Sequence, residues 1–143
     1  MTVKPFRNRP IVDRLKGGGY PKVQGLVEWS RLAAAPAHRV ALFVIPEREV
    51  ARPNEMTGVH DQRVARGFKV IIVLKPSVRV DDDASEELEE EVAKVIDLIA
   101  GWTHPDASGP CDYAGGKLLS ADGWGIAWGV DFTTAWRLRK GTS

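Results

Sequence analysis

Residues 124–138 read WGIAWGVDFTTAWRL, and the pattern of this segment predicts the main element of the fold. Large or β-branched residues occupy every second position, and the residues between them are small or polar. Strict alternation predicts a β-strand with one buried face and does not fit one face of a helix. The buried face would carry Trp124, Trp128, Phe132 and Trp136, each able to bury ~150–250 Å². We therefore expect this strand to contribute a large part of the hydrophobic core.

The expected strand is longer than most. Fifteen residues would extend roughly 50 Å, whereas strands in globular proteins usually have fewer residues. Long strands commonly contain a bulge or a bend, and glycine is the residue that tolerates one. We therefore expect a bulge or bend at Gly129.

Length and composition fit one soluble domain. The chain has 143 residues, of which 43% are hydrophobic and 27% charged, so we expect a single domain over residues 1–143 with a basic extension, residues 1–9, as a candidate flexible segment. The single Cys111 excludes an internal disulfide and indicates a reducing compartment. Residues 1–10 lack the apolar region of a secretory signal, and the apolar runs are too short to span a bilayer.

The net charge is only +1, but the charges are segregated. Residues 1–22 contain six basic residues against Asp13, and residues 81–97 contain nine acids against Lys94. Charge runs are usually solvated, so one interpretation is an exposed helix and a basic tail. The other is a self-complementary surface that brings subunits together head to tail.

Three helices are expected, at residues 8–16, 26–35 and 84–100. Asn8 is the expected cap of the first, and Pro36 stops the second. The third has Asp83 with Glu86 as a capping box and Gly101 as its stop. Its apolar residues follow one continuous stripe, formed by Leu88, Val92, Val95, Ile96 and Ile99.

The other ordered segments are expected strands. Residues 40–45 are continuously apolar, which suits a strand covered on both faces. Residues 59–64 and 68–75 are extended around an expected bulge at Gly67, and residues 113–119 turn back into the long strand as a hairpin. The order of elements predicts an α+β fold, a mostly antiparallel sheet of about four strands with helices packed on one face.

Patterns typical of catalysis or metal binding are missing from the sequence. His38, His60 and His104 are far apart, and Cys111 is alone, so neither a metal nor a cofactor is expected. No GxSxG motif and no phosphate-binding loop are present, and we expect no catalytic residues. In a strand, alternation would place His60 on one face and Asp61 and Arg63 on the other, which argues against a shared catalytic site. The five tryptophans fit a core better than a base-stacking surface, so sequence-specific nucleic-acid binding is not expected.

Residues 46–58 form a polar segment that is longer than a hairpin requires. One interpretation is a merely exposed loop, and the other is an arm that binds a partner, because binding residues concentrate on loops held by a rigid scaffold. In the second interpretation, arginines of this segment pair with carboxylates of the acidic helix on an adjacent subunit. The candidate assembly interface comprises Arg48, Arg52, Asn54, Glu55, Glu86 and Glu90.

An ordered set of short motifs extends over residues 10–138. It comprises FVIP at 43–46, ARPN at 51–54, TG at 57–58, QRV at 62–64, Phe68 with Val70, YAGGKLL at 113–119, and finally Trp128, Asp131, Phe132 and Thr134. With these motifs the sequence resembles the small tail terminator, or tail completion, proteins of long-tailed bacteriophages.

The resemblance implies a non-enzymatic subunit of a ring, typically a hexamer. The ring would bind the end of the completed tail tube, stop its growth and offer the surface that joins the head connector. Its partners would be other copies of the chain, the tail tube protein and the head–tail connector protein, and phage DNA would have a path through the ring. The expected location is the head-proximal end of the virion tail, after assembly in the host cytoplasm. The alternatives are another head–tail joining protein, such as a stopper or adaptor, and a small ligand-binding or hydrolytic domain.

Overall fold

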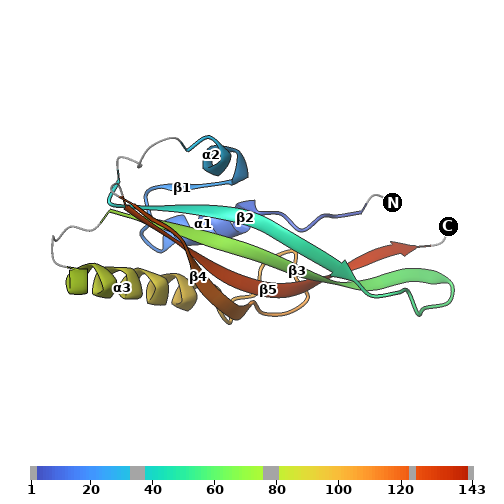
Figure 1. The fold of residues 1–143 in the computed structure, drawn as a ribbon. Coiled ribbons are helices and arrows are strands. Elements are labelled where there is room, and N and C mark those ends of the chain that lie inside the picture. Colours follow the sequence, from blue (N-terminus) through green and yellow to red (C-terminus); the bar gives the residue numbers. More distant parts are fainter. Residues whose placement is uncertain (1–2, 33–37, 76–80, 123–124, 142–143) are drawn as a thin grey trace.

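The computed structural model describes residues 3–32, 38–75, 81–122 and 125–141. A five-stranded mixed sheet has the strand order β1-β2-β3-β5-β4 (Figure 1). Its strands are β1 (Val23–Gln24), β2 (Val40–Ala51), β3 (Val59–Leu74), β4 (Asp112–Asp122) and β5 (Gly125–Gly141). β1 is parallel to β2 and all other pairs are antiparallel, so the predicted α+β class is confirmed, with one short strand more than expected.

β5 is the strand predicted from the alternation, and it lies between β3 and β4. Val130, Phe132, Thr134 and Trp136 are buried on one face, as expected, whereas Trp128 is only half-buried. The predicted position of Trp124 lies outside the described residues.

The predicted bulge at Gly129 is wrong. The pairing of β5 with β3 runs in continuous register from Ile126 to Gly141, and the irregularities lie on the neighbouring strands β2 and β4. Gly129 has a different role, because a Cβ there would lie 2.9 Å from Cδ of Lys69, whose stem covers it. The bulge expected near Gly67 occurs opposite it on β2, between Pro46 and Arg48.

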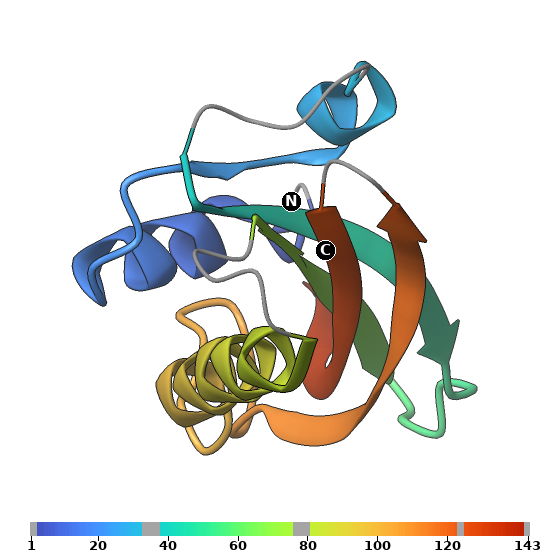
Figure 2. The ribbon, with the colours of Figure 1, turned by 60° about the vertical axis from the view of Figure 1, so that its left-hand side comes forward.

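Helices cover both faces of the sheet, so the prediction of helices on one face is wrong. α1 (Arg9–Gly17) and α3 (Asp81–Ile99) share a core with Leu42, Phe68 and Phe132 on one face. The short helix α2 (Leu26–Ser30) lies on the other face (Figure 2). There Trp29 packs on Phe43, with ring centroids 5.3 Å apart. The continuously apolar residues 40–45, now part of β2, already indicated cover on both faces of the sheet.

The predicted N-terminal caps of two helices differ from the structure. α3 begins at Asp81, which places Asp83 inside the helix, so the expected capping box is wrong. Asn8 precedes α1 as predicted, but its side chain makes no cap and its Nδ2 instead donates to the carbonyl of Val44 at 3.2 Å. Gly101, with φ of +81°, follows α3 as the expected stop.

The N-terminal segment is anchored to the domain. Phe6 is buried and stacks on His104 with centroids 3.9 Å apart. Arg7 donates to both carboxylate oxygens of Asp106, at 2.8 and 3.1 Å. His104 Nε2 donates to the carbonyl of Arg7 at 2.6 Å. We call the contacts among Arg7, His104 and Asp106 the N-terminal clasp, and they hold residues 6–8 against the loop after α3.

Candidate assembly surfaces

β2, β3 and the end of β5 extend well past the helices as a projecting arm, which we define as residues 48–64 and 136–141 (Figure 1). Most of the segment expected to be a loop belongs to this arm, because β2 continues to Ala51 and the connection spans only residues 52–58. Pro46 is tolerated within β2 because β1 pairs only with Leu42 and Phe43, leaving this part of β2 at the sheet edge.

Asn54 shapes the tip of the arm. Its Oδ1 accepts hydrogen bonds from the backbone N–H of Met56 and of Asp61, at 3.2 and 3.0 Å. Its Nδ2 lies 3.4 Å from the carbonyl oxygens of Met56 and Val59. The side chain is therefore engaged within the loop, which it holds in one shape.

Arginines gather on one face of the arm. Arg63 on β3 lies directly opposite Arg137 on β5, and both line a hollow of about 200 Å³ together with Arg52 and Met56. Like charges directly opposite on a sheet are destabilising. Asp61 offsets this repulsion, because its carboxylate lies 3.2 Å from Nε of Arg137 and 3.6 Å from Nε of Arg139.

The root of the arm is tied to the core on the opposite face of the sheet. Trp136 Nε1 donates to Glu49 Oε2 at 2.6 Å, and Arg66 lies 3.4 Å from the same carboxylate oxygen. The guanidinium of Arg66 in turn lies over the ring of Phe6, 5.2 Å from its centroid. These contacts fix the direction in which the arm leaves the domain.

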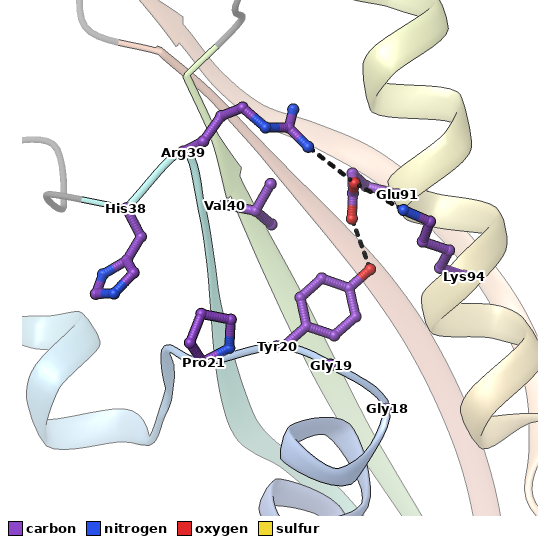
Figure 3. A pocket seen from close by; sticks show the side chains of 9 residues that line it. All are labelled: Gly18, Gly19, Tyr20, Pro21, His38, Arg39, Val40, Glu91 and Lys94. Carbon is purple, nitrogen blue, oxygen red and sulfur yellow. Dashed lines mark hydrogen bonds and ion pairs between the residues drawn. The ribbon is translucent and has the colours of Figure 1, made fainter.

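The second surface is the acidic helix α3. Glu86 and Glu90 are exposed, as a solvated acidic face requires, but Glu91 is buried. Tyr20 donates its hydroxyl to Glu91 at 2.6 Å, and Arg39 and Lys94 reach the other carboxylate oxygen at 3.2 and 3.4 Å (Figure 3). Burial and the neighbouring carboxylate raise the pKa of Tyr20 above its usual value.

Glu91 was not among the residues predicted from the sequence to form a site, although its position on α3 indicates its role. The residue falls on the apolar stripe of α3, three positions after Leu88 and four before Val95, so it had to face the domain. A hollow of about 360 Å³ lies beside it, lined also by Gly18, Gly19 and His38 (Figure 3). The hydrogen bonds of Glu91 with Tyr20 and Arg39 join α3 to the segments around those residues, whereas the bond with Lys94 lies within α3. This is a structural role.

His104 and Cys111 are both buried in the core, whereas His60 lies on the arm. His60 Nε2 lies 2.5 Å from Gln62 Oε1, on the face opposite Asp61, as the alternation predicted. His104 is fully buried, and desolvation lowers its pKa. Cys111 is also buried, which raises the pKa of its thiol. Within the described residues, no group of three His, Cys, Asp or Glu side chains could hold a metal ion, and no helix could cross a membrane.

The six candidate residues fall into two separate groups. Arg48 and Glu55 are exposed on the arm with Arg52 and the half-buried Asn54, whereas Glu86 and Glu90 lie on α3. α3 begins at the end of the molecule that is farthest from the arm tip (Figure 1). One chain therefore does not bring the two groups together. Arg63, Arg137 and Met56 join the first group, and only the strand register could have identified the two arginines.

The family comparison covers the whole sequence. The family model described as phage tail terminator protein matches residues 1–143. No curated protein matches the sequence significantly. The match includes the residues that form the arm, the acidic helix and the N-terminal clasp. The chain therefore belongs to the phage tail terminator protein family.

Proposed function

We propose that this protein forms a closed ring, a hexamer, on the head-proximal end of the completed tail tube. The ring stops addition of further tube subunits and presents the surface to which the head–tail connector binds. Family membership supports a structural role in the virion tail. Assembly would take place in the host cytoplasm. Phage DNA passes through the ring without sequence-specific contacts.

The separation of the two charged surfaces carries this proposal. A ring needs two different, complementary patches on opposite sides of each subunit, so that the same contact repeats around the axis. The arm carries Arg48, Arg52 and Arg63, and α3 carries Glu86 and Glu90 at the far end of the subunit. Opposite charge on such patches steers association and fixes the register of the contact.

A ligand-binding or hydrolytic function is less well supported. An enzyme site needs polar groups that converge on a cavity and remain available to a substrate. The polar hollow beside Glu91 does not offer this, because the carboxylate already binds Tyr20, Arg39 and Lys94. Another head–tail joining role, as stopper or adaptor, fits the charged surfaces equally well, and the family match favours the terminator.

The test reverses the charge of the arm with the double variant Arg48→Glu, Arg52→Glu. Both side chains are exposed, so the domain should fold normally, with an unchanged circular dichroism spectrum. Ring formation should be lost in native mass spectrometry, and infected cells should accumulate overlong tails that fail to join heads. The control, Lys16→Glu with Arg31→Glu, makes the same change in charge at exposed positions outside the arm. Normal rings and tail lengths from the folded arm variant would show that the arm is not an assembly contact.

A further inference from the structure

α3 leaves part of its own face of the sheet uncovered. An apolar groove of about 290 Å³ lies between the helix and β5, lined by Leu88, Glu89, Val92, Ala93, Ile96 and Trp128. Trp128 was expected in the core and is instead only half-buried, because it forms one wall of this groove. Leu118 lies directly opposite Trp128 on the edge strand β4 and is 51% exposed. A continuous apolar surface of this kind marks a binding site on a soluble protein.

The rim of the groove constrains what can bind there. Glu89 lines it, and the exposed Glu86 and Glu90 lie on the same helix. A suitable partner therefore presents an apolar side chain with positive charges around it. Such an arrangement buries apolar surface at the centre and leaves ion pairs at the solvated edge, as in most protein interfaces.

The arm tip has this chemistry. Met56 is 54% exposed and lines the same hollow as Arg52, Arg63 and Arg137. Methionine is unbranched and adapts its side chain to irregular apolar surfaces. Asn54 holds the backbone at Met56, so little conformational entropy would be lost when this side chain binds a partner.

We propose that the arm tip of one subunit binds the α3 groove of a second copy, with Met56 against Trp128 and Val92. The arginines around Met56 then face the carboxylates of Glu86, Glu89 and Glu90. Since the arm tip and α3 lie at opposite ends of the subunit, the contact is head to tail and each copy can both give and receive an arm (Figure 1). This inference rests on the proposed ring and specifies the contact that closes it.

Site-directed cross-linking tests the contact. Met56→Cys and Ala93→Cys are placed in separate chains, and the two purified variants are mixed and oxidised. Both positions are exposed, and Ala93 lines the groove, whereas the native Cys111 is 1% exposed. The expected result is a disulfide-linked pair of the two variants, and a covalent ladder when both cysteines are in one chain. Met56→Cys mixed with Lys16→Cys, an exposed position on α1, is the matched control and should remain uncross-linked.

Two failures are distinguishable by measuring ring formation in the same samples. Rings without the cross-link between positions 56 and 93 would overturn the arm–groove contact and leave the proposed ring standing. Absence of rings in the parent protein, even with tail tubes present, would overturn the proposed function and this contact with it. Cross-linking of Ala93→Cys to the tail tube protein in place of a second copy would also overturn the inference.

Discussion

Replacing Trp136 with alanine should destabilise the domain more than any other single tryptophan substitution within the described part of β5. The side chain is 6% exposed, packs in the core formed with α1 and α3, and donates to Glu49 at 2.6 Å. Truncating a buried tryptophan costs ~3–5 kcal/mol, including the cavity that remains. For a chain of 143 residues each kcal/mol lowers Tm by roughly 3 °C, so the expected loss is roughly 10–15 °C.

Two further variants separate packing from hydrogen bonding. Trp136→Phe keeps most of the ring but removes the donor to Glu49, which costs about 1 kcal/mol because the carboxylate is partly open to water. Trp128→Ala removes a half-buried side chain and should cost about half as much as Trp136→Ala. Thermal unfolding followed by far-ultraviolet circular dichroism measures all three. The assigned burial would be refuted if Trp136→Ala melted within about 2 °C of the parent, or if Trp128→Ala were the more damaging change.

Two more predictions concern pH and the edge strand. Desolvation lowers the pKa of His104 in the folded state, so the unfolded chain binds a proton at His104 more readily than the folded chain does. The free energy of unfolding should therefore be at its full value above about pH 6.5 and should fall as the pH drops toward the folded-state pKa. Denaturant titrations between about pH 7.5 and about pH 5 should show this loss, with a shallower slope in His104→Gln; equal slopes would contradict it. Gly116→Ala should cost ~1–3 kcal/mol, because the new Cβ would lie 2.8 Å from Trp128 Nε1 and 3.0 Å from the carbonyl of Gly129. Gly17→Ala, with open space at its Cβ, is the control and should be neutral or stabilising in the same melts.

The parts of the fold set by periodicity could be predicted from the sequence. The alternation after Gly125 and the stripe from Leu88 to Ile99 depend only on which residues are apolar, and both elements occur as expected. β1 was missed because two residues, Val23 and Gln24, are too few to show a period. The continuously apolar residues 40–45 indicated cover on both faces of the sheet, but nothing in the periodicity of α2 identified it as the helix that covers the second face.

The sequence identified charged residues for the two candidate surfaces, but it did not give their arrangement in space. The segment with Arg48 and Arg52 was expected to be a loop over residues 46–58, but its first residues extend β2, since an edge position tolerates Pro46. The pairing of Arg63 with Arg137 depends on a register that joins residues far apart in sequence. The N-terminal clasp of Arg7, His104 and Asp106 could not be predicted for the same reason. Its contacts join residues that are far apart in the sequence, and no local sequence pattern indicates such pairs.

Tail-tube growth in the presence of the purified protein is the direct test of whether the protein caps the tube as a ring. Tube subunits are allowed to polymerise with and without the protein, and the tubes are imaged by electron microscopy while native mass spectrometry follows the protein itself. A hexameric ring should bind one end of each tube, and the tubes should stop lengthening once the ring is bound. Tubes that bind no ring and grow at the same rate with and without the protein would contradict the proposed function.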